Sequence, residues 1–344
     1  MPQVLIPSDN RDFVFQLAAA YRRRSWDVVV GASNFDLQSA RYDLVHLQWP
    51  EELSGWKPPS ESRLKDIVLR LDGWAQQARV IITVHNLLPH RQWNDPAYHT
   101  LFEAVYQRVS VLAHFTETSR QIVATEFPVA NTRSNVVTGG FNLDYLLPAQ
   151  HDPEAARQQL GLSSDDFVVL VFGGLREWAE VTLVRDAFAT TNVARKRLLM
   201  CGRYDEFGPV WRQRWRRWTW ARWLRKNRAI TIPEYIPDAE VHRVLDASDV
   251  LLLPRLRALN SGLPALAASF GKPLAAPRYG AFPELLNGTA NPLYETGNAR
   301  DLARAIEEAS RLERPTIYNQ NRDLAESWDW DAIVASGLQA VGLG

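Results

Sequence analysis

The feature that most constrains the fold is a repeated alternation of short apolar runs with longer segments of helical periodicity. The runs in the first half of the chain are residues 4–7, 28–31, 44–48, 80–85, 111–115 and 135–138. Those in the second half are residues 167–172, 197–201, 230–232, 250–253 and 274–276. Short apolar strands that alternate with helices indicate parallel sheets covered by helices on both faces. The sequence therefore predicts an α/β protein with two doubly wound parallel sheets.

The chain length favours two domains, because 344 residues exceed one ordinary domain and suffice for two buried cores. A proline-bounded polar stretch at residues 147–153 marks the linker. We predict domains over residues 1–148 and 149–325, followed by a terminal helical segment over residues 326–344. Near the start of the chain we expect a helix over residues 13–21, capped by Asp9 or Asn10.

Charge and cysteine content exclude several classes of protein. Lys+Arg and Asp+Glu both total 39, so no global field attracts the chain to nucleic acid. The single cysteine, Cys201, rules out an internal disulfide and fits a reducing compartment. No run of about 18 apolar residues and no signal-peptide pattern occurs. We therefore expect a cytoplasmic protein that does not span the membrane.

Residues 249–286 combine a buried strand, a polar loop, a small-residue helix and a second strand. The loop carries Asn260, Ser261 and Gly262, which are residues that favour a helix start. The free N–H groups and the dipole of a helix N-terminus can hold a diphosphate. Glu284 opens the next polar segment and is a candidate to hydrogen-bond a ribose or sugar hydroxyl. This stretch therefore predicts a nucleotide-sugar site.

A second candidate phosphate loop follows the strand at residues 167–172. Gly173 and Gly174 let the backbone approach a phosphate closely, and Arg176 adds positive charge. A plain tight turn explains the glycines equally well when they are taken alone. The loop does not match G-x-G-x-x-G, which argues against a dehydrogenase.

These patterns resemble bacterial glycosyltransferases of the GT-B fold, in particular glycosyltransferase family 4-like enzymes of exopolysaccharide synthesis. The Asn-Ser-Gly loop before a small-residue helix is similar to a divergent branch that includes the beta-mannosyltransferase of xanthan assembly. That resemblance implies two Rossmann-like domains with a cleft between them and a C-terminal helix that crosses back. It also implies that the segment containing Tyr235 lies beside the nucleotide base. The family usually carries two glutamates around the small-residue helix, and both are replaced here.

His85 ends the predicted strand at residues 80–85 and lies at the carboxyl edge of the first sheet. The resemblance implies that a histidine in this position touches the donor sugar. An imidazole there can hydrogen-bond a hydroxyl or, with a pKa near neutrality, move a proton. His90 is a weaker candidate on the acceptor side. For both, a histidine satisfied by local backbone bonds remains an alternative.

Polar and aromatic residues also follow the strand at residues 44–48. Trp49 can stack on a sugar face, and Glu51 or Glu52 can deprotonate an acceptor hydroxyl. Asp9 is a third candidate base, with Asn10 beside it on the acceptor side. Carboxylates that only cap a helix or lie on the surface are the alternative for the two glutamates.

Residues 211–226 hold five tryptophans and seven basic residues and no acid. As a helix, the segment places Trp211, Trp215 and Trp218 on one face. Such a helix can lie in a membrane interface, drawn by anionic headgroups at about 1 kcal/mol per nearby cation. Tryptophans packed on the domain beneath solvated arginines are one alternative, and nucleic-acid binding is another.

We expect a hexosyltransferase that moves a sugar from a UDP- or GDP-linked donor to a saccharide, carried on a polyprenyl pyrophosphate, in bacterial exopolysaccharide or glycoconjugate synthesis. The expected location is the cytoplasm or the inner face of the cell membrane. No metal motif is present, so we expect neither a metal nor another cofactor. A non-catalytic sugar-nucleotide or glycan-binding protein on the same fold and a nucleic-acid-associated protein remain alternatives.

Overall fold

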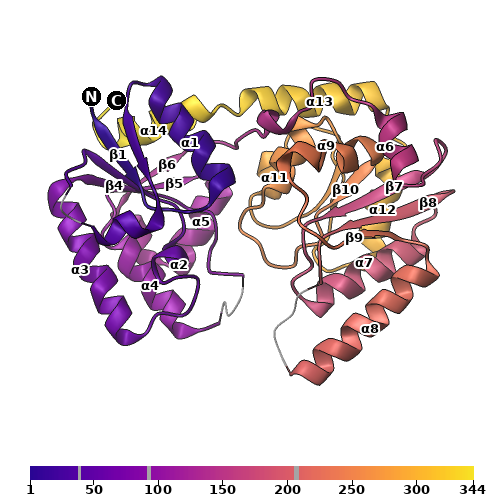
Figure 1. Ribbon diagram of the computed structural model, residues 1–344, viewed down its shortest axis with the longest axis horizontal. Coiled ribbons are helices and arrows are strands. Elements are labelled where there is room, and N and C mark those ends of the chain that lie inside the picture. Colours follow the sequence, from indigo (N-terminus) through magenta and orange to yellow (C-terminus); the bar gives the residue numbers. More distant parts are fainter. Residues whose placement is uncertain (38–39, 91–93, 205–208) are drawn as a thin grey trace. The chain divides into compact units, whose positions relative to one another are not determined.

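The computed structural model describes the chain except for residues 38–39, 91–93 and 205–208. It divides into two compact units, each of which combines separate stretches of sequence (Figure 1). The first unit comprises Met1–Phe141, Ala258–Asn260 and Trp328–Gly344, and the second comprises Asn142–Arg257 and Ser261–Ser327. The change from the first unit to the second thus falls at residue 142, shortly before the boundary proposed from sequence at residue 148.

The first unit contains a parallel six-stranded sheet in the order β2-β1-β3-β4-β5-β6. Its strands are β1 (Gln3–Ile6), β2 (Asp27–Val30), β3 (Leu44–Leu47), β4 (Arg79–Thr83), β5 (Val111–His114) and β6 (Ser134–Val137). All six match apolar runs in the sequence. The inner strands β1, β3, β4 and β5 are largely buried between helices and leave no polar alternation, whereas the edge strands β2 and β6 are only partly buried. The predicted doubly wound sheet is therefore confirmed in this half of the chain.

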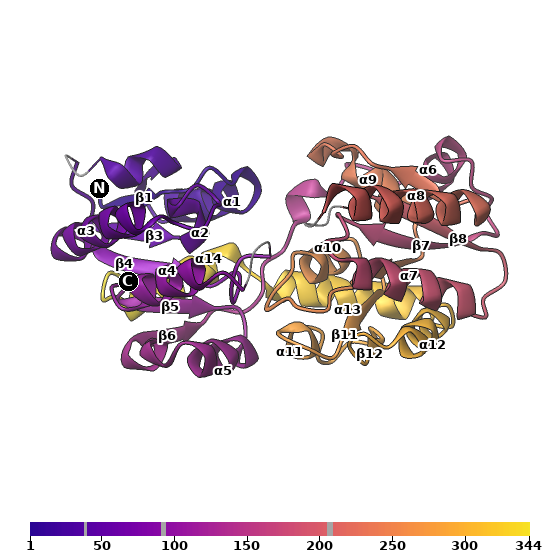
Figure 2. The ribbon, with the colours of Figure 1, turned by 90° about the horizontal axis from the view of Figure 1, so that it is seen from below.

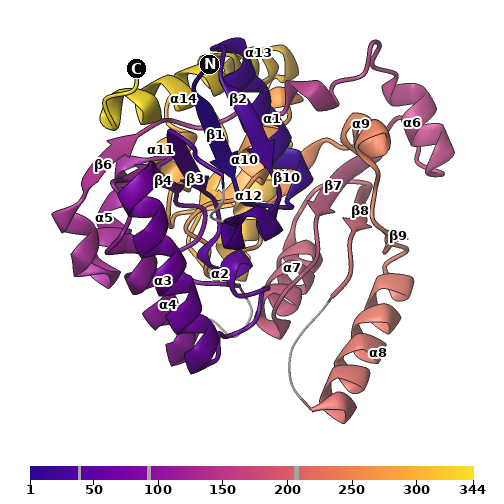
Figure 3. The same ribbon diagram turned by 60° about the vertical axis from the view of Figure 1, so that its left-hand side comes forward.

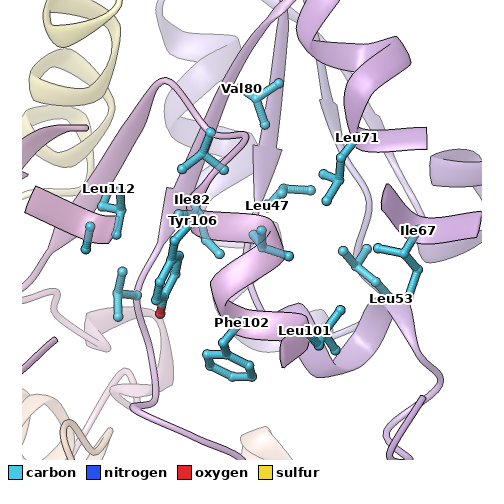
Figure 4. Close-up of a cluster of buried hydrophobic side chains, with 14 of the residues drawn as sticks. Leu47, Leu53, Ile67, Leu71, Val80, Ile82, Leu101, Phe102, Tyr106 and Leu112 are labelled. Carbon is cyan, nitrogen blue, oxygen red and sulfur yellow. The ribbon is translucent and has the colours of Figure 1, made fainter. Parts of the chain in front are cut away.

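Helices cover both faces of this sheet (Figure 2). They are α1 (Arg11–Arg23), α2 (Pro50–Leu53), α3 (Glu61–Gln77), α4 (Pro96–Tyr106), α5 (Glu117–Glu126) and α14 (Trp330–Ala340), with short 3-10 turns η1 (Ala32–Asp36) and η2 (Pro128–Thr132). Successive strand residues point to opposite faces. Accordingly, Leu5 packs in the cluster with α3 and α4 shown in Figure 4, whereas Val4 and Ile6 pack against α1 and α14.

The helix expected at residues 13–21 is α1, and its predicted side-chain cap is wrong. Asn10 is the N-cap residue but its side chain makes no capping hydrogen bond. The Asp9 carboxylate instead accepts from the backbone N–H of Ala32, at 3.0 Å. Asp9 therefore ties the loop after β1 to the loop after β2.

The second unit contains a parallel sheet in the order β12-β11-β10-β7-β8-β9. Its strands are β7 (Phe167–Phe172), β8 (Lys196–Cys201), β9 (Ile230–Ile232), β10 (Val250–Leu252), β11 (Leu274–Pro277) and β12 (Leu293–Tyr294). Its helices are α6 (Pro153–Gln159), α7 (Trp178–Thr190), α8 (Val210–Lys226), α9 (Asp238–Ala247), α10 (Leu263–Ser269), α11 (Phe282–Leu285), α12 (Ala299–Ala309) and α13 (Arg314–Ser327), and η3 (Asp144–Leu146) precedes them. Five strands match the prediction, whereas the two-residue β12 is too short to leave a pattern.

Candidate functional site

The strand order of the second unit reverses beside β7. After β7 the chain adds β8 on one side, and it later returns to add β10 on the other side. In open parallel sheets, ligands bind outside the carboxyl ends of the strands at such a reversal. The loops that follow β7, β8 and β10 are therefore the candidate ligand site of this unit.

Three glycines form a close-packed corner at the carboxyl ends of β7 and β8. The N–H of Gly173 donates to the carbonyl of Cys201 at 2.7 Å, and Gly173 has a φ of 87°. A Cβ on Gly202 would lie 2.7 Å from the carbonyl carbon of Gly173, and one on Gly174 would lie 2.8 Å from the carbonyl oxygen of Arg203. Side chains are thus excluded at Gly174 and Gly202, and Gly174 is exposed, so a phosphate group can approach the backbone there. The sequence predicted Gly173 and Gly174 but missed Gly202, a single glycine without a motif.

A buried ion pair holds this glycine corner from the β10 side. Arg255, which follows β10, donates to Glu180 Oε2 at 2.8 Å and to the carbonyl of Gly174 at 2.9 Å. Both side chains are buried, with Arg255 7% and Glu180 2% exposed. The same Glu180 oxygen accepts from the backbone N–H of Arg176 at 2.7 Å. Burial raises the pKa of Glu180, and the Arg255 charge opposes that rise. The pair therefore fixes the loop that carries Gly174 and Arg176.

Other residues predicted to bind the donor lie at the same sheet edge, on loops or on the short helix α11, because all six strands are parallel. Tyr235 follows β9, is 77% exposed, and donates its hydroxyl to Asp238 at 3.4 Å. Ser261 and Gly262 precede α10, where the Ser261 hydroxyl accepts from the N–H of Leu263 at 3.2 Å. Glu284 lies on α11 after β11 and is exposed. The edge thus carries the set of residues that the sequence predicted, apart from Asn260.

Asn260 belongs to the first unit and does not cap a helix. Its amide nitrogen donates to the carbonyls of Val84 and His85 at 3.0 and 3.2 Å. Its amide oxygen accepts from the Ser119 hydroxyl at 3.0 Å, and the residue is 9% exposed. The N-cap residue of α10 is instead Gly262, which has no side chain to cap with. The Asn260 side chain therefore does not contribute the cap chemistry expected of the Asn260-Ser261-Gly262 loop.

The first unit has an equivalent reversal of strand order between β1 and β3. Glu52, which follows β3, accepts from the Ser8 hydroxyl at 2.6 Å and from the N–H of Asp9 at 2.7 Å. Glu52 is 8% exposed, and burial raises its pKa despite these hydrogen bonds. Asp9 itself is exposed, with Asn10 half-buried beside it. Glu52 thus anchors the loop that presents the Asp9 carboxylate.

His85 follows β4 and is held by a side chain from the β3 loop. The Gln48 amide nitrogen donates to the carbonyl of His46 at 3.5 Å, so its oxygen faces His85 Nε2 at 3.0 Å. The network therefore assigns the proton to Nε2 and leaves Nδ1 as an acceptor. Burial, together with neighbouring His46, lowers the pKa of His85 to about 3. His85 is neutral near pH 7, which favours the hydrogen-bonding role over the proton-transfer role expected from sequence.

Aromatic rings surround His85. Trp49 stacks on the imidazole at a centroid distance of 4.1 Å and an angle of 18°, so one face of that indole is covered. Trp56 lies 6.2 Å from Trp49, is 52% exposed, and has a φ of 61°, which is a strained conformation for a bulky residue. The sequence did not single out Trp56. His90 is exposed on the loop after β4.

Glu51 is a core residue. It is 1% exposed, and its Oε1 accepts from the Asn86 amide at 3.1 Å. Its Oε2 is buried without a hydrogen-bond partner among the residues that the structure describes. Burial raises the pKa of Glu51 to about 7. The Glu51 carboxyl is thus shielded from solvent, whereas the Asp9 carboxylate is exposed.

The buried Glu51 carboxyl predicts a pH-dependent difference between the wild type and Glu51→Gln. The pKa of Glu51 in the folded protein, about 7, lies above the ordinary glutamate value of 4.5. The protonated carboxyl therefore stabilises the folded state fully below pH 4.5, and this stabilisation is lost as the pH rises through 7. Relative to the wild type, Glu51→Gln should therefore gain up to about 3 kcal/mol in unfolding free energy between pH 4.5 and pH 8. Urea unfolding at several pH values measures this difference. A constant difference would contradict the shifted pKa.

The tryptophans assigned to the acceptor or membrane side lie on α8 of the second unit. Trp211, Trp215 and Trp218 are 73%, 58% and 57% exposed. Among the described residues, no group of three or more potential ligands is arranged to hold a metal ion. Within the same residues, no helix has the length and apolar character needed to cross a membrane.

The sequence and the fold were compared with known proteins. Residues 166–311 match the family model described as "Glycosyl transferases group 1". No curated protein sequence matches the chain. The matched segment contains β7 to β12 and thus the glycine corner, Arg255 and α10.

Solved structures show the same fold over the whole chain. Anabaena HepE in complex with UDP has a TM-score of 0.73 at 15% identity, covering 99% of this chain and 100% of that one. Sucrose-phosphate synthase from Thermosynechococcus elongatus has a TM-score of 0.74 at 16% identity, covering 99% and 98%. The catalytic domain of starch synthase IV from Arabidopsis thaliana, bound to ADP and acarbose, has a TM-score of 0.69 at 14% identity, covering 100% and 98%. The predicted GT-B fold with two Rossmann-like domains is confirmed.

Proposed function

We propose that this protein is a glycosyltransferase that moves a hexose from a nucleoside diphosphate sugar to a saccharide hydroxyl. The observation that carries the proposal is the glycine corner of the second unit. Gly173, Gly174 and Gly202 pack without side chains at the carboxyl ends of β7 and β8, beside the strand-order reversal. A close-packed glycine backbone at this position is suited to a diphosphate.

The comparisons support the same proposal. The glycosyltransferase family model spans the segment that contains the corner. Anabaena HepE, which has the same fold, has been solved with UDP, with UDP and glucose, and with UDP-glucose. We propose that Arg176 and the Ser261-Gly262 loop stabilise the leaving diphosphate, that Glu284 binds the ribose or sugar, and that Tyr235 lies beside the base. UDP and GDP both remain open as the nucleotide.

On the acceptor side we assign roles to Asp9, which is exposed, and to His85, which is half-buried. Asp9 is an exposed carboxylate on a loop anchored by Glu52, so we place the base of an inverting reaction there. His85 is neutral, and its Nδ1 can accept a hydrogen bond from a sugar hydroxyl. We further propose a polyprenyl-pyrophosphate-linked acceptor, a role in exopolysaccharide or glycoconjugate synthesis, a kinship with the xanthan mannosyltransferase branch, and a reaction that needs no metal.

The assignment of Arg176 and Ser261 is tested by an activity assay. Arg176→Ala combined with Ser261→Ala should lower kcat/KM for donor hydrolysis or transfer at least about tenfold, because a charge and a polar loop group near the diphosphate are lost. The assay measures release of nucleoside diphosphate from a panel of UDP- and GDP-sugars. Arg185→Ala is the matched control, since Arg185 pairs with Asp186 on α7. Undiminished activity in the double variant would remove the proposed donor site.

A non-catalytic sugar-nucleotide or glycan-binding protein on the same fold is the second candidate. Two observations favour it: the family's glutamates around α10 are absent, and the Glu51 carboxyl is buried. Calorimetry and the turnover assay separate the two candidates. Nucleotide binding without turnover of any donor in the presence of saccharide acceptors would support the binding protein.

A further inference from the structure

The helix α8 presents tryptophans to the outside although its inner side is already filled with apolar residues. Trp220 and Leu224 are buried in the core cluster of the second unit, and Trp223 stacks on Trp220 at 5.1 Å and 12°. The outer tryptophans, Trp211, Trp215 and Trp218, are each more than half exposed. They are spaced by four and three residues, so they share one helix face. Packing of the domain therefore leaves more than half of each of these side chains uncovered.

Cations border this tryptophan face. At 3.6 residues per turn, Arg214 and Arg225 lie on one side of it and Lys226 lies on the other. Arg222 lies over the Trp218 ring, with its guanidinium carbon 5.9 Å from the ring centroid. All four of these cations are exposed, and the helix contains no acidic residue. The outer face of α8 thus combines aromatic and positive groups only.

The order of these groups distinguishes between two kinds of anionic partner. The tryptophans occupy the first turns of the outer face, and Arg222, Arg225 and Lys226 follow them on the last turns. Tryptophan rings favour the headgroup level of a bilayer, where flanking arginine and lysine side chains reach lipid phosphates. Single-stranded nucleic acid is instead held in a positively charged groove lined by stacking aromatic rings, whereas α8 is a single helix at the rim of the second unit (Figures 1 and 3). The arrangement on α8 therefore fits a lipid surface better.

Figures 1 and 3 show α8 at the rim of the second unit, beside α7 and the strands β8 and β9. Trp178 of α7 lies under this region, with Trp215 at 6.5 Å and the Arg216 guanidinium at 5.3 Å from its ring. These contacts pack α8 against α7. A surface bound by the outer face of α8 would therefore be attached to the folded second unit.

We propose that α8 binds an anionic lipid surface, with Trp211, Trp215 and Trp218 inserted at headgroup depth and the bordering cations on lipid phosphates. The inference concerns α8 alone and stands independently of the proposed function. It assigns the membrane-facing side to the second unit.

Flotation of the full-length protein with vesicles tests the proposal. The wild type should float with vesicles of equimolar phosphatidylglycerol and phosphatidylcholine, and should not float with pure phosphatidylcholine. The triple change of Trp211, Trp215 and Trp218 to alanine should lower the partition coefficient at least about tenfold, because the inserted area is lost. Arg214→Gln with Arg225→Gln should also lower it roughly tenfold, with a weaker response to added salt. Trp56→Ala removes a half-exposed tryptophan from the first unit, and this variant should float normally.

Two further measurements keep the test decisive. Brominated lipids should quench tryptophan emission of the wild type, a readout that needs no variant. Circular dichroism should show that the triple variant is folded. Its affinity for UDP or GDP should equal that of the wild type. Nucleotide binding thus tests the proposed function separately from lipid binding. Unchanged flotation of the triple variant would overturn the proposal. So would a wild type that binds an oligonucleotide but no anionic vesicle at the same salt concentration.

Discussion

Gly202→Ala is expected to weaken UDP or GDP binding at least about a hundredfold, which corresponds to roughly 2.7 kcal/mol. The added Cβ would lie 2.7 Å from the carbonyl carbon of Gly173 and 2.8 Å from the nitrogen of Gly174. Both are backbone atoms, so the clash is relieved only by moving the loop after β7. Because Gly202 also has a φ of 123°, alanine adds backbone strain. Isothermal titration calorimetry with each nucleotide measures the loss.

Gly288→Ala is the matched control for this variant. Gly288 lies in the same unit and has a φ of 81°, but a Cβ there would meet nothing within 4 Å. It therefore carries the strain of the left-handed conformation without the steric clash. We expect a modest decrease in Tm and wild-type nucleotide affinity. If Gly202→Ala bound nucleotide as tightly as Gly288→Ala, the glycine corner would not be the nucleotide site.

Arg255→Met is expected to lower the free energy of unfolding by about 3–5 kcal/mol. The substitution leaves the Glu180 carboxylate, which is 2% exposed, without its charged partner. It also removes the hydrogen bond from Arg255 to the carbonyl of Gly174, so the glycine corner loses a support. Chemical denaturation measures the loss of stability, and calorimetry measures the accompanying loss of nucleotide affinity.

The decrease in the free energy of unfolding caused by Arg255→Met should depend on pH. Burial already raises the pKa of Glu180, and without Arg255 that pKa rises further. Stability from the protonated carboxyl is present at low pH and is lost as the pH rises through the folded-state pKa. The deficit should therefore be larger at pH 8 than at pH 5. The double change Arg255→Met with Glu180→Leu should recover part of the stability, and the absence of any recovery would contradict the ion-pair explanation.

Although β2, β6 and β9 are only partly buried, the fold could be read from the sequence because the central strands of both sheets are buried on both faces. Such strands appear as continuous apolar runs, and eleven of the twelve strands coincide with runs recognised in the sequence. Helix α8 coincides almost to the residue with the segment 211–226 that its composition sets apart in the sequence. The missing strand, β12, has two residues and gains its regular structure only from pairing with β11.

The side-chain partners could not be read from the sequence, because they come from distant parts of the chain. Asn260 looked like a helix cap, yet its amide bonds to Val84, His85 and Ser119. Glu51 and Glu52 are neighbours in sequence, but Glu51 is a core residue and Glu52 anchors the loop after β1. Local pattern indicates which edge of a sheet a residue reaches. Tertiary packing decides which way the side chain points.

Residues Gly202 and Arg255 show the same limit in the second unit. Neither belongs to a recognisable sequence motif. Gly202 follows β8 and Arg255 follows β10, and each lies against Gly173 or Gly174, which follow β7. The parallel order of β8, β7 and β10 brings these loops together. Only the observed strand order identifies them as one corner.

The most direct test of the central claim is a crystal structure of the protein soaked with UDP and, separately, with GDP. We predict electron density for a diphosphate against the backbone of Gly173 and Gly174, at the carboxyl ends of β7 and β10, with the Arg176 side chain nearby. The nucleotide that occupies the site identifies the donor base. A diphosphate bound elsewhere on the protein, with the glycine corner empty, would contradict the assignment of the donor site.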